Sequence, residues 1–132
     1  MSFSDPISEL LIKLKNAQLA RKDHVIIYYS KLIETILNIL KNKGFIEDFK
    51  ISDENSKVKK IIIILKYVDN QPAIRGVHRV SKPSRRVYKS VNEIKPIYNG
   101  YAVSVYSTNK GIITDKEALR SNVGGEFLFY IW

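Results

Sequence analysis

The last quarter of the chain, residues 101–132 with the sequence YAVSVYSTNKGIITDKEALRSNVGGEFLFYIW, holds the pattern around which the rest is organised. Residues 101–106 form a strand-like run in which Tyr101, Val103 and Val105 alternate with Ala102, Ser104 and Tyr106, and the polar stretch 107–111 follows. Thr114 and Glu117 have the spacing of a capping box and predict a short helix, with Asn122 closing it. The segment 124–126, Gly-Gly-Glu, then precedes a final apolar strand. Two polar turns therefore border buried strands, and we expect them to share one edge of a sheet.

Composition limits the classes of protein to which the chain can belong. Its 132 residues are enough for one domain or two small subdomains that pack together. Cysteine is absent and only two histidines are present, so we expect no disulfide, no metal and no cofactor. No apolar run reaches the length of a membrane span, and the amino terminus lacks a signal-peptide pattern, so we expect no membrane partner.

Positive charge is concentrated in one segment. The whole chain has a net charge of +9, for which a solubilising surface is the simplest explanation. Between residues 75 and 110, however, Glu93 is the only acid, against Arg75, Arg79, Lys82, Arg85, Arg86, Lys89, Lys95 and Lys110. Clustered basic residues with Tyr88 and Tyr106 nearby are typical of a nucleic-acid-binding surface.

The first half predicts the order α-β-α-β-β. Asp5-Pro6 begins an amphipathic helix, and Ser30 begins a second helix that ends near Gly44. Strands are predicted at residues 25–28, 45–51 and 59–67, with a polar turn at 52–56. Turn-forming residues at 69–72 mark the boundary between subdomains 1–70 and 71–132. The predicted class is α+β: two small packed subdomains, the second mostly β with short helices.

Catalysis has little support in the sequence. Ser107, His78 and Asp115 can be drawn as a triad, but no nucleophile elbow surrounds a serine. Lys110-Gly111 lacks the other residues of a phosphate-binding loop. We therefore expect neither an enzyme nor a small-molecule substrate. A DNA-binding module is the rival hypothesis, but the helix after Thr114 offers only Lys116 and Arg120 to a groove.

The two polar turns are the candidate binding site. Small hydroxyl and amide side chains at 107–109 can reach bases, sugars or phosphates, Lys110 adds a charge, and Gly111 a permissive backbone. Glycines at 124 and 125 allow close approach of another backbone, and Glu126 can accept hydrogen bonds from RNA donors. The structural alternatives are an ordinary turn and a bulge at a strand start. Lys13 and Asn16 lie on the polar side of the first helix. Two interpretations of them are equally open: they are solvated surface residues, or they contact a phosphate or sugar.

The chain resembles the family of bacterial-type small-subunit ribosomal protein eight, the S8 family, from Asp5 to its last residue. The matching blocks in the first half are Asp5-Pro6-Ile7, Lys15-Asn16-Ala17, Tyr29-Ser30-Lys31-Leu32 and Gly44-Phe45-Ile46. Those in the second half are Arg79-Val80-Ser81-Lys82-Pro83, Arg86-Val87-Tyr88-Lys89, Ser107-Thr108-x-Lys110-Gly111, Thr114-Asp115 and Gly124-Gly125-Glu126. The chain departs from the family pattern at a few positions, including Asn109 in place of a usual serine and Ser84 in place of a common glycine.

The resemblance implies a structural protein of the small ribosomal subunit that binds the central domain of 16S-type ribosomal RNA early in assembly, beside neighbouring small-subunit proteins. It implies a location in the ribosome, either of the cytoplasm or of an organelle. Some members of the family also bind their own operon messenger RNA and repress its translation. Carried over to this chain, the main RNA contacts are Arg86, Tyr88, Ser107, Thr108, Asn109, Lys110, Gly124, Gly125 and Glu126. Secondary contacts are Asn16, Ser30 and Lys31.

Overall fold

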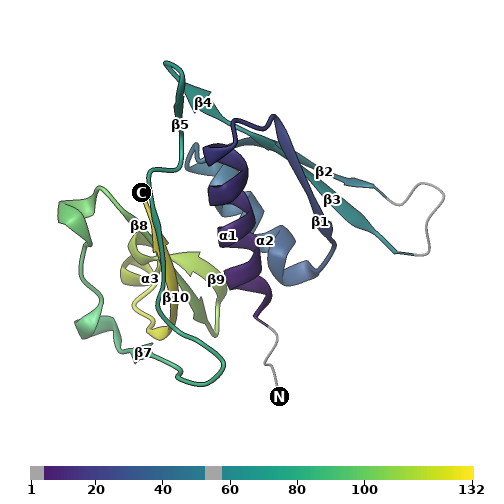
Figure 1. Cartoon of the computed structure of the whole chain (residues 1–132). Helices are drawn as coiled ribbons and strands as arrows, with labels where there is room; N and C mark the ends of the chain where they lie inside the picture. The colour runs from purple at the N-terminus through teal and green to yellow at the C-terminus, as the bar shows by residue number, and fades with distance from the viewer. Residues whose placement is uncertain (1–4, 53–57) are drawn as a thin grey trace. The chain divides into compact units, whose positions relative to one another are not determined.

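The computed structural model describes residues 5–52 and 58–132, which form two compact units (Figure 1). One unit is Pro6–Arg75; the other contains Gly76–Trp132 together with Asp5. The first unit therefore runs past the predicted boundary at residue 70. The reason is a small hairpin, since β4 (Tyr67–Val68) pairs with β5 (Gln71–Pro72) and keeps the turn residues in the first unit.

The first unit is a three-stranded antiparallel sheet with two helices. Its elements in chain order are α1 (Pro6–Leu19), β1 (His24–Tyr28), α2 (Lys31–Asn42), β2 (Ile46–Ser52), β3 (Lys60–Leu65) and the β4–β5 hairpin. The strand order is β1-β3-β2, with α1 against β1 and α2 against β2 (Figure 1). This confirms the predicted α-β-α-β-β order. Most of the predicted turn at 52–56 lies outside the described residues.

Local signals in the sequence explain where the second helix begins and ends. The Ser30 hydroxyl accepts a hydrogen bond from the Ile33 amide at 3.1 Å, as an N-cap does. Gly44 follows the helix with a φ of 84°, the left-handed conformation that ends many helices. Between these ends, one apolar stripe is buried, formed by Ile33, Ile36, Leu37 and Leu40.

The second unit is built around β10 (Gly125–Ile131), which runs through an antiparallel sheet (Figure 1). The strand order is β6-β10-β8-β9, and β7 also pairs with β10. The strands are β6 (Val77–Arg79), β7 (Tyr88–Lys89), β8 (Val103–Thr108) and β9 (Gly111–Thr114). Helix α3 (Asp115–Arg120) follows β9, and single 3₁₀ turns lie at Val91–Glu93 and Tyr98–Gly100. The unit is mostly β with short helical pieces, as predicted.

The stretch 107–111 corrects one prediction. It was expected to be a turn from a strand into a helix, but Ser107 and Thr108 are the last residues of β8 and Gly111 is the first of β9. The turn itself is Asn109-Lys110, within a hairpin in which Thr108 is paired with Gly111. Pattern reading missed β9 because its four residues are followed at once by the capping box of α3.

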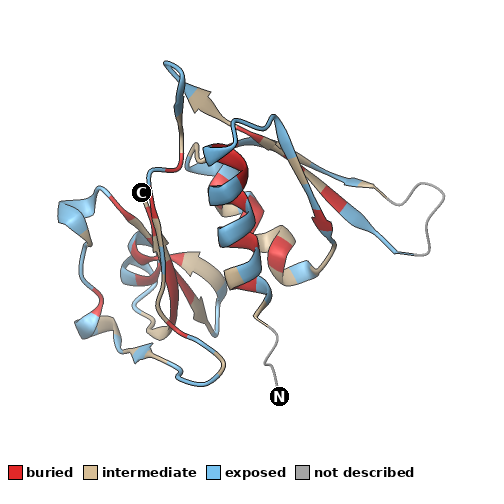
Figure 2. Ribbon diagram, in the orientation of Figure 1, coloured by how far each residue is buried: buried red, intermediate tan, exposed pale blue. Residues whose placement is uncertain are grey.

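The core of the second unit contains one unusual tyrosine. Tyr106 is 2% exposed and stacks on Phe127 at a ring-centroid distance of 4.6 Å, next to Ala118 and Ile94. Burial, with a smaller effect from the Asp115 carboxylate, raises the pKa of Tyr106 to about 12. Within this unit, Figure 2 shows many buried residues in β8 and β10 and exposed residues in the surrounding loops. The middle parts of β8 and β10 thus pack in the core, and polar side chains occur at the ends of these strands.

Candidate nucleic-acid interface

Three strands place three of the predicted site residues in one row. Glu126 on β10 is directly opposite Tyr88 on β7 and Ser107 on β8. Side chains that are directly opposite in an antiparallel pair lie on the same face of the sheet. Tyr88 is 67% exposed, Ser107 is half-buried, and the Glu126 side chain is 15% exposed. The structure therefore brings an aromatic ring, a hydroxyl and a carboxylate together on one face, from three segments distant in sequence.

The two glycines before Glu126 are required by the packing of this sheet. A Cβ on Gly125 would lie 2.2 Å from the carbonyl oxygen of Ser107, and one on Gly124 would lie 2.4 Å from that of Lys89. Both neighbours are backbone atoms and cannot rotate away. The expectation that another backbone approaches these glycines is met by the protein's own strands on either side.

The tip of the β8–β9 hairpin is held by its own threonine. The Thr108 hydroxyl donates to the Gly111 carbonyl at 2.9 Å and accepts from the Lys110 amide at 3.1 Å. Asn109 and Lys110 between them are exposed, and Gly111 has a φ of 103°, which L-residues rarely adopt. Because adjacent residues on a strand point to opposite faces, Thr108 lies on the face away from Ser107 and Glu126. Its methyl carbon lies close to the Cβ position of Gly125. Thr108 and Glu126 thus flank the same end of the sheet from its two faces.

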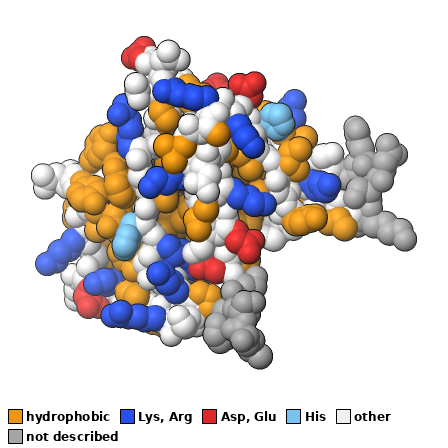
Figure 3. All heavy atoms as spheres, viewed as in Figure 1, with side chains coloured by type: hydrophobic (Ala, Val, Ile, Leu, Met, Phe, Trp, Pro, Cys, Tyr) orange, Lys and Arg blue, Asp and Glu red, His pale blue; other side chains and the backbone are white. Residues whose placement is uncertain are grey.

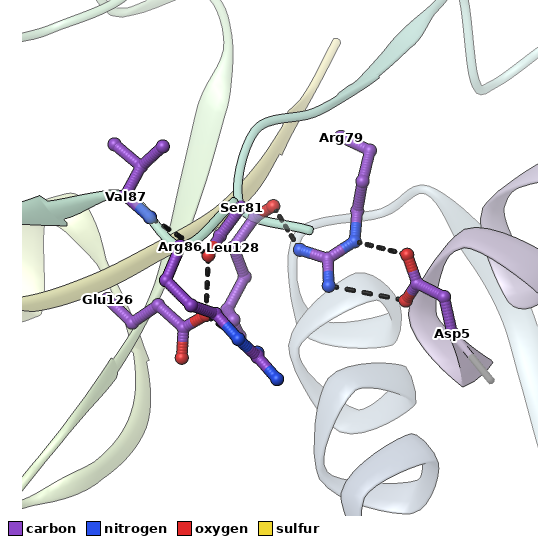
Figure 4. A network of polar contacts seen from close by, with 7 residues as sticks. All are labelled: Asp5, Arg79, Ser81, Arg86, Val87, Glu126 and Leu128. Carbon is purple, nitrogen blue, oxygen red and sulfur yellow. Dashed lines mark hydrogen bonds and ion pairs between the residues drawn. The ribbon is translucent and has the colours of Figure 1, made fainter. Parts of the chain in front are cut away.

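Glu126 is the centre of a polar network within the second unit (Figure 4). Its Oε2 accepts hydrogen bonds from the Ser81 hydroxyl and, at 3.0 Å, from Nη1 of Arg86. The buried Ser81 hydroxyl also accepts from the Val87 amide at 3.1 Å. Both recorded contacts use one carboxylate oxygen, and Oε1 has no partner among the residues in Figure 4. The side chain is therefore an internal anchor for Arg86 as well as a candidate acceptor for RNA donors.

The charge of Glu126 is stabilised by these neighbours. Burial alone would raise the pKa of its carboxyl group, but the hydrogen bonds from Ser81 and Arg86 and the charges of Arg86 and Arg79 outweigh that effect. The pKa of Glu126 is consequently below its ordinary value, and the carboxylate is ionised at neutral pH. In return, the hydrogen bond to Glu126 raises the pKa of Arg86.

A second ion pair lies beside this network in Figure 4. The Arg79 guanidinium donates through Nε and Nη2 to the two carboxylate oxygens of Asp5, at 3.3 and 3.2 Å. Its Nη1 donates to the Leu128 carbonyl at 2.6 Å. Both side chains are largely buried, at 10% and 17% exposure. Arg79 is thus fully used in holding Asp5 to β10, and its charge is not presented to solvent.

Two further basic residues of the segment are presented on a tight loop between β6 and β7. Lys82 and Arg85 are joined by two backbone hydrogen bonds of 2.9 Å, which close the loop around Pro83. Both side chains are exposed, and neither forms an ion pair with an acid in the described part of the chain. Figure 3 shows several Lys and Arg side chains over the part of the molecule that contains this loop and β7.

The predicted secondary contacts belong to the first unit. Lys31 is 83% exposed at the start of α2 and lies 3.8 Å from Glu34. Ser30 beside it caps that helix through its hydroxyl, and Asn16 is exposed on α1. These three residues therefore lie in a different compact unit from the row of Tyr88, Glu126 and Ser107.

Sequence reasoning missed Ser81 as part of the site. Ser81 belongs to one of the sequence blocks that match the S8 family, but no role follows from that match. In the structure its hydroxyl connects Val87, the residue before β7, to Glu126. Sequence separations of 45 and 40 residues, from Ser81 and Arg86 to Glu126, leave no local pattern that could reveal the network. A serine directly before the Lys82-Pro83 turn is the only local signal.

Two further findings concern only residues 5–52 and 58–132. These residues contain no cluster of three or more His, Cys, Asp or Glu side chains arranged to hold a metal ion. They also include no helix of the length and apolarity needed to cross a membrane.

Comparison with known proteins identifies the family of this chain. The family model described as ribosomal protein S8 matches residues 5–132. The chain belongs to the ribosomal protein S8 family. Among S8 relatives, the small ribosomal subunit protein uS8 of Persephonella marina is 49% identical over 98% of both chains. The proteins of the same description from Helicobacter pylori strain Shi470 and Mycoplasma mobile are 46% and 43% identical, over 98% of this chain and 98% and 96% of theirs.

Membership of the S8 family confirms the resemblance and agrees with the predicted α+β class, which the structure shows in three helices and several antiparallel sheets. The S8 family is a class of ribosomal proteins, which are structural constituents of a ribonucleoprotein that acts in translation rather than enzymes.

Proposed function

We propose that this protein is a structural RNA-binding component of the small ribosomal subunit and binds the central domain of 16S-type ribosomal RNA. The single observation that carries the proposal is the row formed by Tyr88, Glu126 and Ser107 across three strands, next to the exposed hairpin tip. Relatives at 43–49% identity are named small ribosomal subunit protein uS8, which supports the assignment to the small subunit.

Irregular RNA is the ligand class that fits this surface best. Regular A-form helices keep their bases stacked and their major groove too narrow for side chains, whereas internal loops expose bases that can stack on an aromatic ring and bond to small polar groups. Tyr88 offers the ring, and Ser107 and Asn109 offer small donors and acceptors. Lys110, with Lys82 and Arg85 on the nearby loop, supplies charges for the phosphates on either side.

The carboxylate sets a condition on what lies against it. Because Glu126 is ionised, a phosphate next to it would be repelled, so its RNA partner must be a donor such as a base amino group or a 2′-hydroxyl. Arg86, which Glu126 holds in place, offsets the local negative charge. Gly124 and Gly125 keep the neighbouring strands close and so fix the spacing of Tyr88 and Ser107 around this acceptor.

In this proposal the first unit provides the secondary contacts. Asn16, Ser30 and Lys31 hold RNA backbone rather than bases, since Lys31 carries an exposed charge and the other two carry small polar groups. An operon messenger that folds into the same irregular stem would be bound by the main surface in the same way. Repression of that messenger is therefore part of the proposal.

The test is a filter-binding titration with the central-domain RNA fragment, duplex DNA and an unrelated RNA of equal length. If about six phosphates are contacted, affinity for the fragment falls roughly 10³-fold or more between about 50 and 200 mM salt. The fragment is expected to bind much more tightly than either competitor at every salt concentration. Equal binding to duplex DNA would overturn the proposal in favour of a general polyanion-binding surface.

A further inference from the structure

The two edges of the first unit's sheet are built differently. The β2 edge carries Glu47, Asp48 and Lys50, and its pairing with β3 shifts register between Ile46 and Asp48. Charges and bulges of this kind keep an edge strand from pairing with another chain. The β1 edge, His24–Tyr28 with the sequence HVIIY, contains no Lys, acid, proline or glycine and pairs with β3 without a register shift. One edge is protected and the other is left open.

The hydrogen-bond pattern shows which backbone groups the open edge presents. Bonds of 3.0 Å join the Leu65 amide to the Asp23 carbonyl and the Tyr29 amide to the Lys59 carbonyl. Bonded pairs alternate along an antiparallel ladder, so the intervening bonds to β3 come from Val25 and Ile27. The N–H and C=O groups of His24, Ile26 and Tyr28 therefore point away from β3, and no other described segment of backbone bonds to them.

The side chains of these three residues lie on the face of the sheet away from the helices. Ile26 is 50% and Tyr28 70% exposed. Ile26 is opposite Ile62, which is half-buried on the central strand. Strand β3 reads KIIIIL, and a continuous apolar run is typical of a strand that is covered on both faces. Since α1 and α2 cover the other face, the apolar residues of the outer face lack a covering layer among the described residues of this unit.

Hollows between α1 and β1 run beside the open edge. One, of about 480 Å³, is lined by Lys13, Asn16, Lys22 and His24 among others. Another, of about 240 Å³, is more apolar and is lined by Leu10, Ile27, Tyr28, Tyr29 and Ile33, with Glu9 at its side. Lys13 borders both. Neither Lys13 nor Lys22 forms an ion pair with an acid of residues 5–52 or 58–132.

We propose that β1 is a docking edge for an extended segment of another protein, which adds a fourth strand to the sheet. The segment would alternate apolar side chains, packed over Ile26 and Tyr28, with acidic side chains directed to Lys13 and Lys22. Strand addition draws its affinity from main-chain hydrogen bonds and its specificity from alternate side chains. The surface shares none of the proposed main RNA contacts, although Asn16 and Ser30, two of the proposed secondary contacts, line the hollows beside it.

Two other occupants fit the edge less well. A phosphate backbone offers acceptors only, whereas the edge presents alternating donors and acceptors that a peptide backbone matches. The exposed ring of Tyr28 could stack on a base, but the aliphatic Ile26 beside it on the same face offers no such ring. A second copy of β1 would bring its own Lys13 and Lys22 toward the same pair, and like charges disfavour that contact.

The test is an NMR titration of the full-length ¹⁵N-labelled protein with a peptide of alternating Val and Glu. Shifts are expected in the amides of His24, Ile26 and Tyr28, with little change in β2. Two N-methylated versions of the peptide are also made, one methylated at the odd-numbered residues and one at the even-numbered residues. Binding should fall about tenfold or more for the version that loses the amides bonded to β1. The other version should bind like the unmethylated peptide. A Val–Lys peptide should bind less tightly than the Val–Glu peptide.

Matched variants separate backbone pairing from side-chain contact. Ile26→Pro removes an N–H that points to the open edge and leaves the ladder to β3 intact, so the fold is retained and peptide binding is lost. Ile26→Val keeps the N–H and should bind normally. Retained Val25 and Ile27 amide protection shows that the proline variant is folded. If that protection is lost, Ile26→Lys replaces the proline variant; it keeps the backbone hydrogen bonds but removes the apolar contact over residue 26, and it must weaken binding.

Three results would overturn the inference. The first is the absence of β1 shifts up to millimolar peptide. The second is β1 shifts caused by a short oligouridylate but not by the Val–Glu peptide, which would assign the groove to RNA. The third is a dimer in sedimentation experiments without peptide that Ile26→Pro dissociates, which would make the edge a contact between copies.

Discussion

The β8–β9 hairpin tip and the start of β10 lie side by side, yet they hold their polar groups in opposite ways. At the tip, the Thr108 hydroxyl bonds to the backbone of Lys110 and Gly111, and Asn109 and Lys110 are exposed. At the start of β10, Glu126 is held by side chains 40 and 45 residues away. The conformation of the tip is therefore set by neighbouring residues, and the tip exposes side chains for binding. The start of β10 is set by contacts between distant segments, and it holds the binding residues in place. Substitutions at the two places should therefore affect RNA binding and stability differently.

Gly125→Ala should have the largest effect, and it should fall on stability. The new Cβ would lie 2.2 Å from the Ser107 carbonyl oxygen, so β8 and β10 must move apart. We expect a loss of about 2–3 kcal/mol in the free energy of unfolding, measured by urea denaturation, as for an overpacked core site.

Gly111→Ala is the matched control at the tip. It has no atom within 4 Å of the new Cβ and suffers only from its positive φ. We expect this variant to lose about 1 kcal/mol. Equal losses for the two glycines would contradict the distinction between the tip and the start of β10.

Tyr88→Ala should reduce RNA affinity with little change in stability, because the ring is 67% exposed. Loss of a base–aromatic stack is expected to cost about 1–3 kcal/mol of binding free energy, or about 5- to 150-fold in Kd. The measurement is filter binding to the central-domain fragment. Tyr88→Phe keeps the ring and should bind almost as well as the unchanged protein; an equal loss in both variants would assign the effect to the hydroxyl.

Glu126→Gln should cost about 1–2 kcal/mol of unfolding free energy at neutral pH, because Ser81 and Arg86 lose a charged acceptor. The pKa of Glu126 is lowered by folding, so its stabilisation is present above the ordinary value of 4.5 and is lost as pH falls through the lowered pKa. Urea titrations across this range should therefore show a steeper loss of stability in the unchanged protein than in Glu126→Gln. Identical pH profiles would show that the network does not hold the charge.

Lys110→Ala should have the smallest effect, since it removes one exposed charge at the tip. We expect a several-fold loss of affinity for all RNAs alike and a reduction of the salt slope by about one. Thr108→Ala, which loosens the same tip, should instead reduce the preference for the cognate stem over random RNA. A selective loss in Lys110→Ala would show that the lysine reads a base rather than a phosphate.

Much of the fold was predictable because its signals are local. The Ser30 cap, the Gly44 helix end and the Thr114–Glu117 capping box all form within a few residues and appear as expected. Strand β9 was missed because four residues leave no room for a clear alternation before the helix begins. The division of the chain after Arg75 depends on the β4–β5 pairing, which turn composition alone does not reveal.

The candidate site was predictable in its residues but not in its geometry. The two polar segments were predicted from their hydroxyl, glycine and charged residues, and Tyr88 was noted because it lies among basic residues. The resemblance to the S8 family then indicated which of these residues contact RNA. That Glu126 pairs with Ser107 and Tyr88, and bonds to Ser81 and Arg86, results from strand pairing between distant segments. Long-range pairing of this kind is set by the whole core, so no short pattern encodes it.

The most direct test of the RNA surface is an NMR map of the labelled protein bound to the central-domain fragment of 16S-type ribosomal RNA. The account predicts that the largest amide shifts fall at residues 86–88, 107–110 and 124–126, with smaller shifts near residues 16 and 30–31. Large shifts confined to α3, or to the β1 edge, with the row of Tyr88, Glu126 and Ser107 unchanged, would contradict it.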